Sequence, residues 1–143
     1  MRIAVLIAVT AAAMGIATAP ATAWASTTPV SYQATNEGSY DQLVIAFPST
    51  PPAFSVSDSA DAPIWGGSGK PVDMPGSYFI YLDGSGSVTA PTSNPATFDL
   101  PNLESVVLYD DFEGYVDFAV GLDHDASYTV TTSGDDVIID VEH

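Results

Sequence analysis

The chain has 143 residues, of which 18 are Asp or Glu and only two are Lys or Arg, so its formal net charge at pH 7 is −16. Nucleic-acid binding needs Lys and Arg to neutralise phosphates, so this composition excludes a nucleic-acid-binding protein. There is no Cys, which excludes disulfides, thiolate metal sites and thiol catalysis.

The first 25 residues have the features of a secretory signal peptide. Arg2 precedes the apolar run Ile3–Ala17, and Ala23 and Ala25 supply an A-x-A cleavage pattern before Ser26. A retained anchor helix is disfavoured because the run is short for a bilayer span. We expect cleavage after Ala25, or otherwise after Ala23, and a secreted protein of about 118 residues with no membrane span and a charge of about −17.

The segment that follows the cleavage site, Ser26–Gly38, is polar and rich in Ser and Thr. It contains Pro29 and shows no periodic apolar pattern, which is typical of a flexible leader. We therefore expect one folded domain over residues 39–143.

From Tyr40 onward, short segments of alternating apolar residues are separated by Gly, Pro, Ser, Asn or Asp, which predicts an all-β fold. The expected strands are Tyr40–Phe47, a short run with Phe54 and Val56, Ser77–Asp83, Ser105–Asp110, Tyr115–Leu122, Ser127–Thr132 and Val137–Glu142. Ser77–Asp83 has apolar side chains on both faces, which indicates a central strand. No window beyond the signal peptide has a helical period.

Two connections are expected to be hairpin turns, Asp111–Gly114 and the tetrapeptide Ser133 to Asp136. Gly114 and Gly134 are the residues expected to take positive φ, because glycine does so at little cost. Phe112 is expected to point inward.

The sequence does not match the catalytic and cofactor-binding motifs that it partly resembles, so we expect no enzyme activity and no cofactor. A phosphate-binding loop ending at Lys70 would need Gly in place of Ile64 and Ser or Thr in place of Pro71. Ser68 has no strand-turn-helix setting for a nucleophile, and two His without Cys are too few for a structural zinc site. Pairs of carboxylates for glycoside hydrolysis are numerous, but nothing selects one pair.

Three acidic residues, Asp110, Asp111 and Glu113, cluster at one predicted turn. Carboxylate oxygens are the ligands that Ca²⁺ prefers, so this turn is a candidate Ca²⁺ site, although it lacks the twelve-residue loop of known calcium motifs. The alternative is that these are simply hydrated turn carboxylates.

Four aromatic residues are candidates for ligand binding: Trp65, Tyr81, Tyr109 and Tyr115. Planar rings stack on sugar faces and carry polar groups at low entropic cost. Trp65 lies in a Gly-rich connection, where it either plugs a loop or contacts a ligand, and tyrosines in strands also serve packing alone.

Three segments in order, GSGKPVDMPG at Gly67–Gly76, VVLYDDFEGYVDFAVGLD at Val106–Asp123 and VIIDVEH at Val137–His143, resemble the AMIN-like domain of secreted actinobacterial proteins and lipoproteins. The resemblance covers nearly all of the chain from Tyr40 onward. It implies a β-sandwich of two mainly antiparallel sheets, related to the AMIN modules that localise cell-wall amidases and secretins by contacting the envelope, with peptidoglycan as the expected contact.

We therefore expect a secreted, monomeric, non-catalytic module that binds wall glycan or another envelope component and is extracellular or associated with the wall. Where the family has arginines, this chain has Gln42 and Asp136, and the lipid-anchor cysteine of many members is missing. Binding must then use hydrogen bonds, stacking or bridging divalent cations. The alternative is a protein-binding domain whose acidic surface steers a basic partner.

Overall fold

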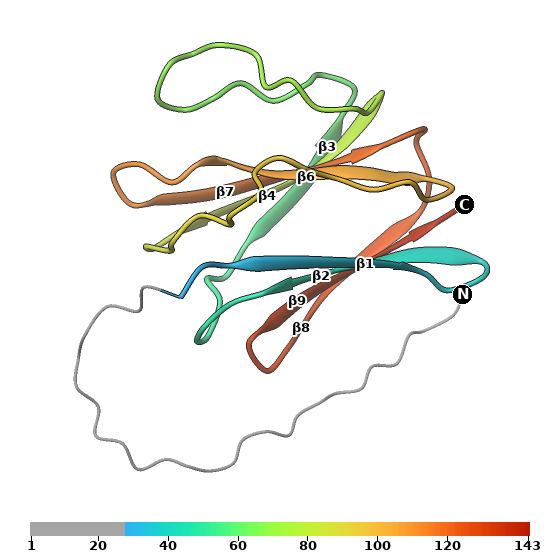
Figure 1. Cartoon of the computed structure of the whole chain (residues 1–143), viewed down its shortest axis with the longest axis horizontal. Helices are drawn as coiled ribbons and strands as arrows, with labels where there is room; N and C mark the ends of the chain where they lie inside the picture. Colours follow the sequence, from blue (N-terminus) through green and yellow to red (C-terminus); the bar gives the residue numbers. More distant parts are fainter. Residues whose placement is uncertain (1–27) are drawn as a thin grey trace.

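A computed structural model describes residues 28–143, which form a sandwich of two antiparallel sheets, one above the other in Figure 1. The nine strands are β1 (Ser31–Asn36), β2 (Tyr40–Ala46), β3 (Ser55–Ser59), β4 (Tyr78–Ser85), β5 (Ala96–Thr97), β6 (Leu103–Asp110), β7 (Tyr115–Leu122), β8 (Tyr128–Ser133) and β9 (Asp136–Glu142). One sheet has the order β1-β2-β9-β8 and the other β3-β4-β7-β6-β5. No helix in this part of the chain is long and apolar enough to cross a membrane.

The predicted all-β sandwich is confirmed, and β7 has the bounds that the sequence pattern predicts. The predicted central strand is also confirmed, since β4 lies between β3 and β7 in the five-stranded sheet. Only β1 and the two-residue β5 were not predicted. The predicted signal peptide, residues 1–25, lies outside the described residues.

The interpretation of Ser26–Gly38 as a flexible leader is wrong for the part that the structure describes. Strand β1 lies within this segment and pairs along its full length with β2, from Ser31 opposite Ala46 to Asn36 opposite Asp41. Val30, just before it, is 1% exposed in the core. The segment shows no clear apolar pattern because an edge strand carries few large apolar side chains and its outward residues are polar.

The core lies between the sheets and is built from the inward side chain of every second residue, as strand geometry requires. Phe118, at its centre, is fully buried, and its ring meets those of Tyr32, Phe47 and Phe54 at centroid distances of 6.3, 6.0 and 5.9 Å. Edge-on ring contacts of this kind contribute about 0.5–1.5 kcal/mol each beyond the burial of area.

The turn between β6 and β7 has the geometry of a type I′ hairpin turn. Glu113 and Gly114 have φ values of 54° and 89°, and the Tyr115 N–H donates to the Phe112 carbonyl at 3.2 Å. The positive φ predicted for Gly114 is confirmed, as is that of Gly134 at 62°. The inward orientation predicted for Phe112 is wrong, because its side chain is 60% exposed at the tip.

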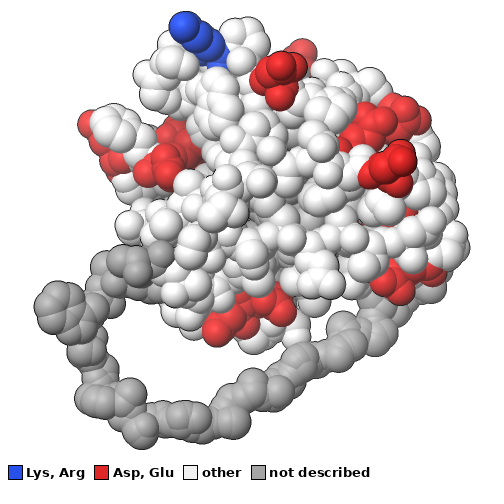
Figure 2. Space-filling view, in the orientation of Figure 1, with Lys and Arg blue, Asp and Glu red and all other residues white. Residues whose placement is uncertain are grey.

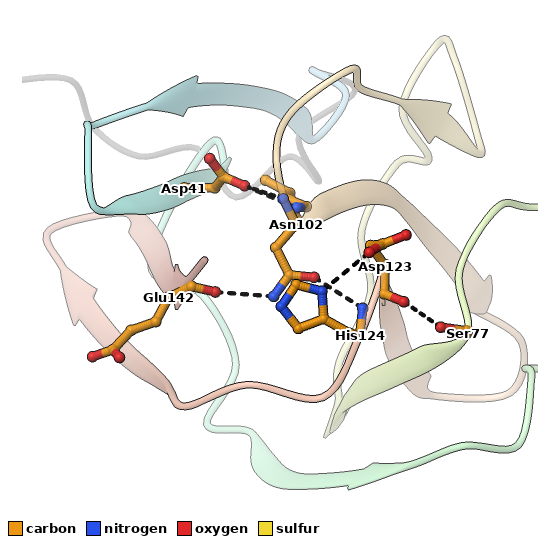
Figure 3. Close-up of polar contacts among 7 residues, drawn as sticks. Asp41, Ser77, Asn102, Asp123, His124 and Glu142 are labelled. Atoms are coloured by element: carbon orange, nitrogen blue, oxygen red, sulfur yellow. Dashed lines mark hydrogen bonds and ion pairs between the residues drawn. The ribbon is translucent and has the colours of Figure 1, made fainter.

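A buried carboxylate joins the two sheets at one end of the sandwich. Asp41 on β2 has no exposed surface, and its Oδ2 accepts from the N–H groups of Asn102 and Leu103 at 2.7 and 2.9 Å (Figure 3). Its Oδ1 lies 2.9 Å from His143 Nε2. A buried donor without a partner lowers stability by about 1–3 kcal/mol. The bonds to Asp41 therefore hold the backbone in place where β6 begins.

Asn102, also fully buried, continues this network to β9 and to the segment after β7. Its Nδ2 donates to the Glu142 carbonyl at 2.9 Å and its Oδ1 accepts from the His124 N–H at 3.1 Å, while the Ser77 hydroxyl donates to the Asp123 carbonyl (Figure 3). This end of the molecule is therefore held by side chains as well as by strand pairing.

Candidate functional site

The outer face of the five-stranded sheet carries most of the residues that the sequence singled out. Inward positions of β4 and β7 supply the core, so Tyr81 and Asp83 on β4 and Asp117 on β7 point outward. In the sheet register Asp83 lies opposite Asp117, and Asp117 lies opposite Asp110. Strand pairing thus brings three carboxylates from three strands into one row.

The loop between β3 and β4 covers part of this outer face. Trp65, Val72 and Met74 from the loop pack against Val107 and Ala119, which form a second, small apolar cluster outside the main core. Hydrogen bonds attach the loop to the sheet: the Gly66 N–H donates to the Tyr109 carbonyl at 2.9 Å, the Tyr81 hydroxyl to the Asp61 carbonyl, and the Ser105 hydroxyl to the Pro75 carbonyl at 2.5 Å.

Trp65, Tyr81 and Tyr109 meet in this small cluster. The rings of Tyr81 and Tyr109 are nearly perpendicular, with centroids 5.9 Å apart. All three side chains are half-buried. The Trp65 ring of the loop and the Tyr81 ring of β4 therefore pack against each other's neighbours within this cluster.

Beside this cluster the sheet face is hollowed. The hollow has a volume of about 560 Å³ and is lined by Ala53, Ser55, Asp83, Gly84, Ser85, Tyr109, Tyr115 and Asp117. Tyr115 is 55% exposed. Of the four predicted aromatic residues, Tyr109 and Tyr115 thus share one hollow, which we call the Tyr109–Tyr115 hollow, and Trp65 and Tyr81 lie outside it.

The two carboxylates of the hollow are hydrogen-bonded but not paired with a cation. Tyr109 donates its hydroxyl to Asp83 Oδ1 at 3.2 Å, and the Gly84 N–H donates to Asp117 Oδ1 at 3.2 Å. In the part of the chain that the structure describes, Lys70 is the sole Lys or Arg, and neither carboxylate forms a salt bridge. Their capacity to accept hydrogen bonds is therefore left for water or a ligand.

Two groups of the hollow, Asp117 and Tyr109, have pKa values above their ordinary values. Partial burial raises the pKa of Asp117, and the neighbouring charges of Asp83 and Asp110 raise it further, against the effect of the Gly84 N–H. Burial raises the pKa of Tyr109, and the two carboxylates add to this. The Tyr109 hydroxyl is therefore a hydrogen-bond donor throughout the physiological range.

The acidic turn that was a candidate Ca²⁺ site is open to solvent. Asp111 and Glu113 are exposed, whereas Asp110 Oδ1 accepts from the Phe112 N–H at 3.2 Å and so stabilises the turn. Among residues 28–143 no three His, Asp or Glu side chains are grouped closely enough to hold a metal ion. Calcium binding at this turn stays a prediction.

Sequence reasoning missed Asp83 and Asp117 as members of the hollow. Each was visible as an outward residue of its own strand, but β4 and β7 are separated by 29 residues of chain that include two other strands. Their pairing register, which a hydrophobic pattern within one strand does not encode, is what places the two carboxylates opposite each other.

The surface is acidic, and on the face seen in Figure 2 the acidic side chains do not form one continuous patch. Figure 2 shows acidic side chains in several separate groups on one face, with a single basic side chain at the rim. Separate groups of like charge keep a protein soluble and repel polyanions.

The model of the AMIN-like domain matches residues 25–143. No curated protein and no solved structure matches the chain.

Proposed function

Because the chain belongs to the AMIN-like domain family, we propose that it is a secreted, non-catalytic module that binds peptidoglycan or another wall component in the Tyr109–Tyr115 hollow. The family match covers the whole described domain and associates it with binding at the cell envelope. The observation that carries the site is the exposed Tyr115, which lines one hollow together with Tyr109 and the opposed carboxylates Asp83 and Asp117.

The chemistry of the hollow suits a ligand rich in hydrogen-bond donors. Tyrosine rings offer apolar faces for sugar rings, and the carboxylates of Asp83 and Asp117 accept from hydroxyl, amide or ammonium groups. A negatively charged hollow disfavours acidic polymers, so neutral or amine-bearing parts of the wall are the expected contact. A small number of oriented polar groups beside aromatic walls is typical of ligand pockets.

The proposal is tested by retention of the secreted protein on purified cell wall, with and without Ca²⁺. We expect Tyr115→Ala to weaken retention about tenfold, since exposed aromatic anchors dominate such contacts. Phe112→Ala is the matched control, because Phe112 is also exposed on the same hairpin but does not line the hollow. No retention of the unaltered protein in either condition would sink the proposal.

The same assay tests the turn as a Ca²⁺ site. If Ca²⁺ bridges the domain to the wall through Asp110, Asp111 and Glu113, Asp111→Asn combined with Glu113→Gln should abolish the calcium-dependent part of the retention. Retention that is unchanged by this double variant would exclude the turn as the bridge.

A second candidate function, binding of a basic protein partner, is supported by the acidic surface and the near absence of Lys and Arg. Electrostatic steering is screened by salt. A complex that is recovered from culture medium at low salt and lost at high salt, with no retention on wall, would favour this function.

A further inference from the structure

Strand β8 is the last strand of the four-stranded sheet, so one of its edges has no neighbouring strand among residues 28–143. In an antiparallel ladder, every second residue bonds to the same neighbour. The Ser127 carbonyl accepts from the Glu142 N–H at 2.9 Å, so Thr129 and Thr131, which follow at intervals of two, also bond to β9. The backbone groups that point to the open edge are therefore those of Tyr128, Val130 and Thr132.

The other edge strands of the sandwich carry protective features that β8 lacks. Strand β5 has only two residues. Strand β3 directs the charged Asp58 inward, opposite the core residue Ile80, and an inward charge discourages the addition of a further strand. The β4–β5 loop covers the beginning of β1, because the Val30 N–H donates to the Thr89 carbonyl at 3.0 Å. Strand β8 has six residues without a charge, Pro, Gly or bulge, which makes it the edge most open to strand addition.

The backbone of β8 is held in place along its length. All six residues pair with β9 in continuous register. The Tyr128 hydroxyl donates to Asp58 Oδ2 at 2.6 Å, which joins β8 to β3 of the other sheet, and the Val130 side chain packs against the main core. An edge that is already ordered lowers the entropic cost of adding a strand to it.

An apolar side chain is exposed on the same side of the sandwich. Val56 and Asp58 are two positions apart on β3 and so share its inward face, with Val56 opposite the core residue Leu82. Val56 is nevertheless 42% exposed. The bond between Asp58 and Tyr128 places this face of β3 beside β8. A strand added to β8 would direct every second side chain toward this open side, where uncharged side chains are favoured.

The charges that flank β8 disfavour its pairing with a second copy of the chain. Asp125 precedes the strand and Asp135 follows it, both are exposed, and Val130 lies midway between them. An antiparallel pair of two β8 strands centred on Val130 would set Asp125 of each copy opposite Asp135 of the other. Like charges that lie opposite each other destabilise a strand pair. A strand with Lys or Arg at these two positions would meet an opposite charge at each end.

We propose that β8 binds an extended basic segment of a protein partner, which adds to the four-stranded sheet as a further strand. The backbone groups of Tyr128, Val130 and Thr132 supply the affinity. Specificity comes from the partner's uncharged middle and from Lys or Arg near both of its ends. This inference rests on the second candidate function, binding of a basic partner, and is independent of the Tyr109–Tyr115 hollow.

The probe is a synthetic peptide of eleven residues with Lys at both ends and alternating Thr and Val between them. Its two Lys are thus as far apart in sequence as Asp125 and Asp135. We expect binding in isothermal titration calorimetry that weakens as NaCl rises. Amide hydrogen exchange of the ¹⁵N-labelled protein locates the peptide. Exchange should slow about tenfold or more at Tyr128, Val130 and Thr132, and change less than twofold at Thr129 and Thr131, which already bond to β9.

The backbone contribution is tested by Thr132→Pro. This variant removes one N–H from the open edge, at a position where an edge strand tolerates Pro, and should weaken peptide binding about tenfold. Thr131→Ala is the control, since Thr131 is exposed on the same strand but its N–H bonds to β9, and it should change affinity less than twofold. Circular dichroism checks that both variants fold.

The contribution of the flanking charges is tested without altering β8. Asp125→Asn combined with Asp135→Asn should weaken peptide binding about fivefold and remove most of its salt dependence. Asp73→Asn combined with Asp99→Asn is the matched control. It removes the same charge from exposed positions outside β8 and its flanks, and should change affinity less than twofold.

The proposal is overturned if the peptide does not bind, if protection falls on β1 or β3 instead of β8, or if the two pairs of Asp variants behave alike. A peptide of the same charge in which Pro replaces each Val cannot form a strand, and equal binding of this peptide would show that charge alone is responsible. Protection of the same amides without peptide, in a dimer seen by sedimentation, would assign the edge to a second copy and also overturn the proposal.

These failures are distinguishable from failure of the proposed function. Retention on cell wall is measured separately and does not involve β8. A salt-sensitive complex in culture medium, with no peptide binding at β8, would leave the second candidate function standing and remove this site from it.

Discussion

Asp117 is a single residue whose ionisation opposes folding. Its pKa is raised mainly by partial burial, and the charges of Asp83 and Asp110 add to this. An acid with a raised folded-state pKa binds its proton more tightly in the folded protein than in the unfolded chain. Its contribution to stability is therefore full below the unfolded pKa, about 3.9, and is lost as pH rises through the folded value.

Asp117→Asn should accordingly raise the thermal midpoint at pH 7, by about 1–3 °C, and give no gain near pH 3, where the wild-type carboxyl is already protonated. The amide oxygen of Asn can still accept from the Gly84 N–H. Unfolding followed by circular dichroism at the two pH values measures the difference. Asp73→Asn, which removes one charge from an exposed loop position, is the control; an equal gain in both variants would refute a specific role for Asp117.

At the scale of one element, the β6–β7 hairpin contains a residue that does not suit its backbone. Glu113 adopts φ of 54°, a conformation that side-chain-bearing residues other than Asn and Asp rarely take, whereas Gly114 at 89° takes it readily. Asn-Gly is the preferred pair for this turn.

Glu113→Asn should therefore raise the free energy of unfolding by about 0.5–1 kcal/mol. Urea denaturation at pH 7 measures this change. Asp111→Asn removes a charge from the same connection at a residue that does not have a positive φ, so it should change the free energy of unfolding less. A loss of stability in Glu113→Asn would contradict the assignment of the turn.

Sequence patterns predicted seven strands, and all of these except the exposed β3 bury one face or both and so carry a clear apolar pattern. The patterns did not predict β1, since Ser31, Gln33 and Thr35 point outward from an edge strand and leave a weak signal. Of the four candidate aromatic residues, Tyr109 and Tyr115 line a hollow, whereas Trp65 packs from the β3–β4 loop onto the sheet and Tyr81 packs beneath that loop. The position of Asp83 opposite Asp117 in the hollow depends on the pairing of two strands that are distant in sequence, and no local sequence pattern encodes that pairing.

For the whole molecule, charge is the dominant surface property. The chain has 18 acidic residues and two basic ones, so its like charges repel one another. This repulsion is strongest in the folded state, where the charges lie closest together, and it therefore lowers the free energy of unfolding. Salt shortens the range of this repulsion from about 30 Å at 0.01 M to about 3 Å at 1 M.

Raising NaCl from about 0.01 M to about 1 M should thus increase the thermal midpoint of the protein, with most of the gain below about 0.2 M, where the screening length falls fastest. KCl should act in the same way if screening is the cause. A midpoint that is independent of salt, or that falls, would show that self-repulsion is a minor contribution in the folded protein.

The pairing of β2 with β9 has a consequence for how the protein is made. Besides its hairpin partner β1, strand β2 pairs with residues 136–142, and all strands of the other sheet lie between these two segments in the sequence. A nascent chain that ends before Asp136 can form the β1–β2 hairpin but leaves the inner face of the five-stranded sheet, with Phe118, uncovered. Such non-local pairing is slow, so the sandwich closes only after β9 has been synthesised, and until then the apolar inner face of the five-stranded sheet is open to contact with other chains.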